Sequence, residues 1–203
     1  MIKEFQTWLK LNKGYSQQTV LEYGKDLHHF VNWLTTTTDK RRFSLVTRKD
    51  VENWVSCMSA AQLAPATIKK RVSALRGLYQ YAWQQGLTKE NPAKWVATPK
   101  RTKTLPQTLT ASEISMAIAD GSIPLITRIM IAILAETGIR ISELLNLRRS
   151  DFDESTHSIF IQGKGRKERR VYYGNLTAAY LSSTFAVGHG KLFEIDDRTA
   201  RYD

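Results

Sequence analysis

Arg140 and Glu143 are the residues of this sequence whose types and spacing point most directly to chemistry. Gly138, a residue type that ends helices in a left-handed turn, precedes them, and a second apolar helical face follows. Arg140 is therefore expected at a helix start, where free backbone N–H groups favour an anion. Its guanidinium can hold a phosphate in two parallel hydrogen bonds, and Glu143 can orient it. The alternative for an isolated Arg-x-x-Glu is an ordinary surface ion pair.

A second cluster of candidate residues is the basic segment 163–168, Gly-Lys-Gly-Arg-Lys-Glu. Segments 158–162 and 169–173 on either side of it read as two strands, which predicts a hairpin with this segment at its tip. The spacing is not that of a Walker A motif, so a nucleotide-binding P-loop is not supported. A plain basic tip is the alternative to a functional one.

Metal and disulfide chemistry find little support in the sequence. Cys57 is the single cysteine, which excludes a disulfide framework or a cysteine metal site, and we expect it on the core side of a helix. His28 and His29 are adjacent, but no further ligands follow at suitable spacing. We therefore expect both histidines at the surface or at an interface.

Helical periodicity dominates the first ninety residues. Apolar residues recur on one face of four segments, which predicts four helices with buried stripes. Ser16 is a good N-cap for the second helix, and Thr47 to Asp50 resembles a capping box for the third. The expected helices cover about residues 1–12, 16–34, 47–58 and 65–85.

The last of these helices carries polar and basic side chains opposite its apolar stripe. Such a stripe is usually a solvated face. It could also lie against DNA, with Lys and Arg on phosphates and Ser, Arg or Gln reaching base edges. The side chains concerned are Lys69, Lys70, Arg71, Ser73, Arg76 and Gln80.

Residues 97–109 are the clearest linker, with two prolines, four threonines and three basic residues. A plain hinge needs no lysines, whereas a strap across a DNA backbone does; the basic residues are Lys100, Arg101 and Lys103. The capping box Thr110 to Glu113 then opens a second domain. Further helices are expected to about residue 120, over 122–136 and over 177–187.

The charge balance of the chain predicts a polyanionic partner. Thirty basic residues against nineteen acidic ones give a net charge of +11 over 203 residues. Nucleic acid is favoured over a membrane surface, because no basic amphipathic helix of membrane type stands out. No apolar run approaches the roughly 20 residues of a membrane span, and the N-terminus lacks a signal-peptide core. These features point to a cytoplasmic protein.

Three segments together resemble a known family. T-G-I-R-I-S-E-L-L-N-L, residues 137–147, closely resembles the first-arginine box of the tyrosine recombinases, the phage integrase family, and especially its Xer-like members. G-K-G-R-K-E-R, residues 163–169, resembles the lysine motif of the family's β-hairpin. T-I-K-K-R-V-S-A-L-R-G-L-Y-Q-Y, residues 67–81, resembles the last long helix of its core-binding domain.

The resemblance implies a mainly α fold in two domains. It implies a four-helix, SAM-like core-binding domain over residues 1–96 and a basic linker over 97–109. Residues 110–203 would form part of a mixed α+β catalytic domain that contains a β-hairpin. Active members assemble as homotetramers on paired sites in double-stranded DNA, so DNA and further copies of the chain are the implied partners.

The activity implied is site-specific DNA recombination, as in integration of a phage or mobile element or in resolution by Xer-like enzymes. A tyrosine attacks a phosphodiester and forms a 3′-phosphotyrosine, which needs neither metal nor cofactor. Arg140 corresponds to the first catalytic arginine and Glu143 to a supporting residue. Lys164 corresponds to the general acid on the leaving 5′ oxygen, with Lys167 as the second choice. Arg166 in the same tip would contact DNA.

The resemblance covers essentially the whole chain, but the assignment of catalytic residues stops after the hairpin. The family's second box is His-x-x-Arg, but none of the four histidines has arginine three residues later. The tyrosines past Arg140 follow no such box, so no nucleophile is assigned among Tyr172, Tyr173, Tyr180 and Tyr202. We therefore expect a C-terminally incomplete chain that binds DNA without cleaving it, with apolar surface exposed in residues 110–203.

Two other functions remain open at this point. The chain could be a DNA-binding module without catalysis that modulates an intact recombinase. An RNA-binding helical protein would also fit the charge, but it would leave both motifs unexplained.

Overall fold

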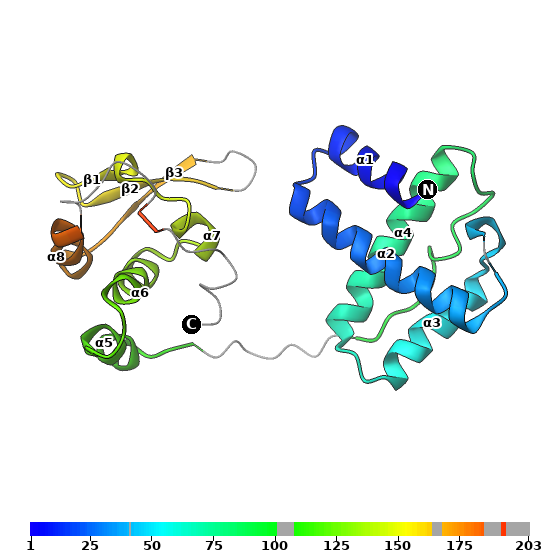
Figure 1. The fold of residues 1–203 in the computed structure, drawn as a ribbon, viewed down its shortest axis with the longest axis horizontal. Helices are drawn as coiled ribbons and strands as arrows, with labels where there is room; N and C mark the ends of the chain where they lie inside the picture. The colour runs from blue at the N-terminus through cyan, green and yellow to red at the C-terminus, as the bar shows by residue number, and fades with distance from the viewer. Residues whose placement is uncertain (41, 101–107, 164–167, 185–191, 194–203) are drawn as a thin grey trace. The chain divides into compact units, whose positions relative to one another are not determined.

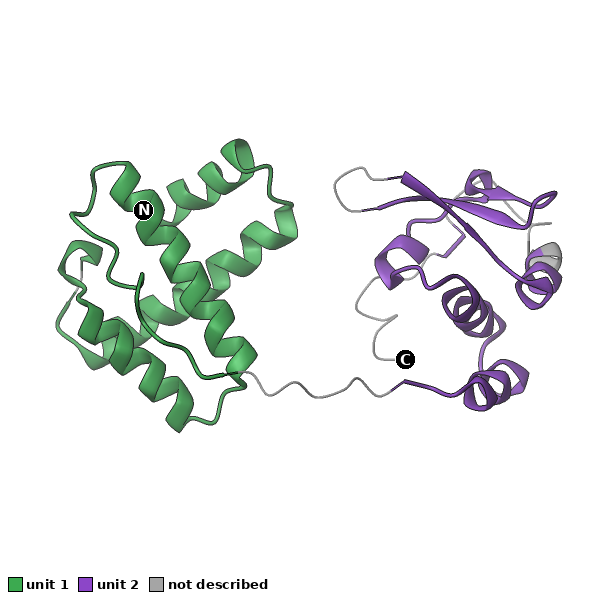
Figure 2. Cartoon of the chain, turned by 180° about the vertical axis from the view of Figure 1, so that it is seen from behind, with its two compact units in different colours: residues 1–105 green, residues 106–203 purple. Residues whose placement is uncertain are grey.

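The computed structural model describes residues 1–40, 42–100, 108–163, 168–184 and 192–193. The chain divides into two compact units, residues 1–105 and 106–203, and each unit is described by itself (Figures 1 and 2). The described residues are mainly helical, with one small antiparallel sheet in the second unit. The predicted fold class, a helical N-terminal domain before a mixed α+β domain with a hairpin, is confirmed.

Four helices and a 3-10 turn (η1) form the described part of the first unit. Ser16 caps its second helix by accepting a hydrogen bond from the backbone N–H of Thr19, and Thr47 and Asp50 form a capping box at its third, both as predicted. The second and third helices begin at these caps, and α2 runs three residues beyond its predicted end at residue 34, to Thr37. Their bounds are α1 Ile2–Asn12, α2 Gln17–Thr37, η1 Phe43–Leu45, α3 Arg48–Ala60 and α4 Pro65–Gln84.

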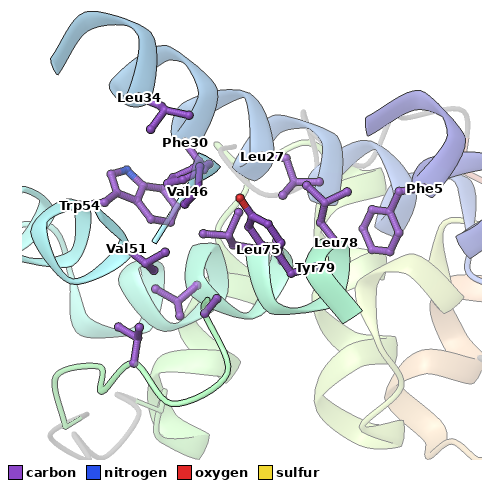
Figure 3. Close-up of a cluster of buried hydrophobic side chains, with 14 of the residues drawn as sticks. Phe5, Leu27, Phe30, Leu34, Val46, Val51, Trp54, Leu75, Leu78 and Tyr79 are labelled. Atoms are coloured by element: carbon purple, nitrogen blue, oxygen red, sulfur yellow. The ribbon is translucent and has the colours of Figure 1, made fainter. Parts of the chain in front are cut away.

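The predicted apolar stripes of the first unit converge on one core. Figure 3 shows the buried side chains of α2, α3 and α4 pointing toward one another, with Phe5 of α1 beside them. Phe30 and Trp54 meet edge to face with ring centroids 4.9 Å apart. The hydroxyl of Tyr79 donates to the backbone carbonyl of Phe43 at 3.0 Å, which satisfies its polar end, and burial raises its pKa.

Cys57 is exposed, so the prediction of a core-side position was wrong. The buried face of α3 is set by Val51, Trp54 and Met58. At 100° per residue, Cys57 lies roughly 90° around the helix from the middle of that face. His28 and His29 are also exposed, as predicted.

Helices on one side of a three-stranded sheet form the second unit. Figure 1 shows α6 between α5 and the sheet, and α6 also packs against α8. The strand order is β1-β2-β3, all antiparallel, and Ile161 of β2 pairs with Arg169 of β3. The bounds are α5 Ala111–Ala119, α6 Leu125–Thr137, α7 Ile141–Leu144, η2 Arg149–Asp151, β1 Phe152–Asp153, β2 Ser158–Gln162, β3 Glu168–Tyr172 and α8 Asn175–Thr184.

The turn between α6 and α7 agrees with the prediction, but the helix after it does not. Gly138 ends α6 with φ +63°, the left-handed conformation that glycine adopts without strain. The expected second helix is only one turn, α7, after which Asn146 and Leu147 donate to carbonyls three residues back. The apolar periodicity misled here, because Leu144, Leu145 and Leu147 are all buried by a tight 3-10 turn rather than by a continuous helix.

Candidate functional site

Arg140 and Glu143 are in direct contact in the turn that opens α7. The backbone N–H of Arg140 donates to Oε2 of Glu143 at 2.9 Å, and its Nη1 donates to Oε1 at 2.9 Å. The side chain of Arg140 is 69% exposed, whereas that of Glu143 is 6% exposed. The buried carboxylate of Glu143 therefore holds the guanidinium of Arg140, which faces outward.

The expected anion site at this helix start has one backbone N–H group fewer than the sequence suggested. α7 is a single turn, and the Glu143 carboxylate already accepts the backbone N–H of Arg140. A carboxylate in this position acts as an N-terminal cap. The exposed donor group at this turn is the guanidinium of Arg140.

Arg169 of β3 is the residue that the sequence analysis missed. Its Nη1 lies 3.0 Å from Oε1 of Glu143 and its Nη2 lies 2.8 Å from Oε2, so the pair is bidentate. These bonds, together with those from Arg140, hold the pKa of Glu143 at about 2 despite its burial. The available signal was strand alternation, since Arg169 and Val171 share the less exposed side of β3, where a charge needs a partner.

The hairpin residues predicted to carry chemistry, Lys164, Arg166 and Lys167, lie outside the described residues. β2 ends at Gln162 and β3 begins at Glu168, and these two residues pair with each other. Arg169 is thus one residue pair inside the end of the ladder. Of the three linker cations, Lys100 is described and exposed, and Arg101 and Lys103 lie outside the described residues.

Part of the polar stripe on α4 faces outward as predicted. Lys69, Ser73 and Gln80 are exposed. Lys70 is exposed as well, but its Nζ lies 3.0 Å from Oε2 of Glu22 and 3.5 Å from Oδ2 of Asp26, both on α2. Its charge is partly neutralised within the fold.

Arg71 and Arg76 do not belong to that outward stripe, which corrects the sequence prediction. Arg71 is half-buried, and its Nε lies 4.0 Å from Oδ1 of Asp26. Arg76 donates from Nε to the carbonyl of Ala93 at 2.9 Å and from Nη2 to the carbonyl of Val96 at 2.5 Å. It fastens the segment after α4 to the helix, and the Ala93 carbonyl also accepts the backbone N–H of Val96 at 3.4 Å.

The described tyrosines near the hairpin are partly engaged in packing. Tyr173 is buried and stacks on His157 with ring centroids 5.3 Å apart, and burial raises its pKa. The hydroxyl of Tyr180 donates to the carbonyl of Ile118 at 3.3 Å. Tyr172 is exposed at the end of β3, and Tyr202 lies outside the described residues. These positions give no reason to assign a nucleophile among the described residues.

The described residues contain no candidate metal site and no candidate membrane span. No group of three or more His, Cys, Asp or Glu side chains in that part of the chain could hold a metal ion. No helix in the same ranges has the length and apolar character needed to cross a membrane.

Two protein-family models match the chain. The N-terminal SAM-like domain of phage integrases matches residues 2–86, and the phage integrase family matches residues 103–195. A tyrosine recombinase XerC of Pediococcus pentosaceus is 35% identical over 179 residues, covering 86% of this chain and 60% of that protein. A tyrosine recombinase XerD of Halalkalibacterium halodurans is 29% identical over 197 residues, covering 95% and 66%. The chain thus spans about 60 to 66% of the length of these relatives.

Solved structures share the fold. A lambda integrase dimer bound to a COC′ core site superposes with a TM-score of 0.74 at 17% identity, covering 98% of this chain and 57% of that one. The Tn1549 transposon integrase in complex with circular intermediate DNA gives a TM-score of 0.69 at 18% identity, covering 97% and 68%. With the two family matches, which together span most of the sequence, these likenesses agree with the motifs at Arg140 and in the hairpin. The chain belongs to the phage integrase family, the tyrosine recombinases.

Proposed function

We propose that this chain binds duplex DNA and that Arg140 holds the phosphate at which the intact recombinase cuts. One observation carries the proposal: an outward-facing guanidinium is held from beneath by a buried, ionised carboxylate. A guanidinium so fixed loses little side-chain entropy when it meets a phosphate, and it offers paired donors to two phosphate oxygens. The relatives named tyrosine recombinases and the DNA-bound integrases of the same fold support DNA as the ligand.

The proposed chemistry of the intact protein is transesterification. A tyrosine hydroxyl loses its proton to solvent, its oxygen bonds to phosphorus while the bond from phosphorus to the 5′ oxygen breaks, and Lys164 supplies the proton that the 5′ oxygen takes up. Arg140 stabilises the charge on the non-bridging oxygens, and Glu143 keeps Arg140 in place. No nucleophile is assigned within the 203 residues, so we propose that they bind DNA without cleaving it.

We propose DNA contacts for residues of each unit. The outward residues of α4, Lys69 and Ser73, would meet the duplex, with Lys70 beside them. Lys100, Arg101 and Lys103 of the linker and Arg166 of the hairpin tip would contact phosphates. Arg71 and Arg76 are left out, since their side chains serve the fold. Assembly as a homotetramer on paired sites belongs to the same proposal.

The proposal is tested by duplex binding measured over a range of salt concentrations. Loss of one phosphate contact lowers the slope of log affinity against log salt by about 1, so Arg140→Ala should show this change and bind more weakly. Arg48→Ala is the matched control, because Arg48 is an exposed arginine paired with Glu52 on α3. Equal effects of the two substitutions would mean that only overall charge matters.

Two further measurements test the rest of the proposal. Affinity for duplex RNA equal to that for duplex DNA would favour the RNA-binding alternative. A nicked duplex that traps covalent intermediates should yield no protein–DNA adduct with the 203-residue chain, and an adduct would refute the non-cleaving part.

A further inference from the structure

We infer that Arg169 is a positioning residue of the proposed phosphate site, which fixes the Arg140 guanidinium through Glu143 and ties that turn to the base of the hairpin. The inference rests on the proposed function of Arg140. It concerns a residue on β3, separated from Glu143 by 26 positions in the sequence.

The two arginines use the shared carboxylate unequally. Arg169 donates from both terminal nitrogens, one to each oxygen of Glu143, at 3.0 and 2.8 Å. Within the described part of the chain, the guanidinium of Arg140 donates to Glu143 from Nη1 alone, at 2.9 Å. A bidentate guanidinium fixes both position and rotation of a carboxylate, whereas Arg140 reaches the second oxygen only through its backbone N–H, at 2.9 Å. Arg169 is therefore the side chain that ties the carboxylate to β3, and the guanidinium of Arg140 keeps donors for a ligand.

Exposure separates the two arginines in the same way. The Arg140 side chain is 69% exposed and that of Arg169 is 39% exposed, whereas the carboxylate between them is 6% exposed. Arg169 also belongs to a strand whose backbone is held by the ladder to β2, so its base is fixed as well. The sheet thus holds Arg169, Arg169 holds the carboxylate of Glu143, and this carboxylate holds the outward guanidinium of Arg140.

The charge of the cluster needs the second arginine. Glu143 and Arg140 alone would form a neutral pair, and a neutral pair attracts a phosphate weakly. Glu143 with both guanidiniums carries one net positive charge, so the buried carboxylate orients Arg140 without cancelling the attraction of the site for an anion.

A brace that only stabilises the fold is the competing explanation, and duplex binding separates the two. Arg169→Lys keeps the charge but removes the fork, so positioning predicts about tenfold weaker DNA binding, in the range of coupling between residues in one network. The double variant Arg140→Ala, Arg169→Lys should bind no more weakly than Arg140→Ala. Arg170→Lys is the matched control on the next residue of β3, whose side chain lies 3.5 Å from Asp153 instead.

A second variant keeps the test decisive if Arg169→Lys does not fold. Glu143→Gln leaves both arginines and raises the net charge by one, so simple electrostatics predicts tighter binding and positioning predicts weaker binding. Glu154→Gln makes the same charge change at an exposed ion pair with Arg149 and should bind as tightly as the unchanged chain, or more so. Backbone amide spectra establish that the second unit of each variant is folded before binding is compared.

The outcomes distinguish the inference from the proposed function. Unchanged affinity in both Arg169→Lys and Glu143→Gln would overturn the inference, as would additive losses in the double variant, which would make Arg169 an independent DNA contact. If Arg140→Ala itself binds DNA as the unchanged chain does, the proposed function of Arg140 fails. Weakening by Arg169→Lys that disappears in the Arg140→Ala background supports the positioning role.

Discussion

Two buried carboxylates, one in each unit, have opposite pKa shifts. Asp26 of α2 has Lys70 at 3.5 Å and Arg71 at 4.0 Å, and burial raises its pKa. Glu143 accepts four N–H groups at 2.8 to 3.0 Å, and its pKa falls to about 2. Both residues are at most 8% exposed, so burial alone does not explain the difference. Removing a charge from water is offset only when cations bond to it directly.

The difference also separates structural charge from functional charge in this molecule. Around Asp26, the cations approach an acidic patch on α2 and lose part of their pull on an external anion. Around Glu143, the two guanidiniums give the cluster a net positive charge, and the guanidinium of Arg140 faces outward. A count of the basic residues on a helical face therefore overestimates how many of them can bind DNA. The hydrogen bonds and ion pairs of each cation show which ones can bind a phosphate.

Glu143→Gln should destabilise the protein more than a substitution of Asp26 or of any cation around the two carboxylates. It replaces charge-assisted hydrogen bonds by weaker ones, and we expect a loss of about 2 kcal/mol in the second unit, since both guanidiniums can turn to water. Amide hydrogen exchange of β2 and β3 measures this unit alone, because one unfolding curve for a two-unit chain is not a single transition. Unchanged exchange would mean that the site is held by packing alone.

The acid dependence of the same substitution has a definite sign. The folded pKa of Glu143, about 2, lies below its ordinary value of 4.5. Its stabilisation is therefore present above about pH 4.5 and is lost as the pH falls toward 2. Exchange rates of the unchanged chain and of Glu143→Gln should converge as the pH falls through this range. A constant difference down to about pH 2 would contradict the role of the ionised carboxylate.

Local sequence signals predicted much of the fold, and they also predicted the Arg140–Glu143 contact in the site. The caps at Ser16, Thr47 and Thr110 and the turn at Gly138 depend on neighbours within three or four residues, so the sequence displays them. The Arg140–Glu143 contact is of the same kind. Such interactions hardly depend on how distant elements pack.

The parts that the sequence did not reveal depend on distant pairing. Arg169 meets Glu143 only because the hairpin register brings its strand to α7. Arg76 meets the carbonyl of Ala93 only because the chain folds back along α4. The segment from α7 to Leu147 shows the same limit, because the burial of its leucines could be predicted from the sequence and the conformation that buries them could not. Periodicity shows which residues are buried, and packing decides what they touch.

Arg76→Ala extends the comparison from carboxylates to carbonyls. The substitution leaves the carbonyls of two buried residues, Ala93 and Val96, without this donor, and we expect the first unit to lose about 1 to 2 kcal/mol. Duplex affinity should stay within about twofold when measured well below the melting temperature, because a cation used inside the fold adds little to phosphate binding. A large loss of affinity with unchanged stability would show that Arg76 contacts DNA after all.

Asp26→Asn should have the opposite sign to Glu143→Gln. A carboxylate whose folded pKa is raised disfavours folding above its unfolded pKa, so removing the charge at pH 7 should stabilise the first unit by up to about 1 kcal/mol. Exchange rates of α2 and α4 amides measure the change. Destabilisation as large as that of Glu143→Gln would show that the contacts of Asp26 with Lys70 at 3.5 Å and Arg71 at 4.0 Å stabilise the fold more than these distances indicate.

Lys69→Ala should have the smallest effect on stability and a clear effect on binding. Lys69 is exposed on α4, so we expect its loss to change unfolding by less than about 0.5 kcal/mol. It should lower the slope of log affinity against log salt by about 1, as for a lysine that contacts a phosphate. Lys70→Ala is the matched neighbour: it should change the slope less, since Lys70 already pairs with Glu22 and Asp26. If Lys69→Ala and Lys70→Ala change the slope equally, ion pairing within the fold does not decide which cations contact DNA. The difference between Asp26 and Glu143 would then affect stability and not DNA binding.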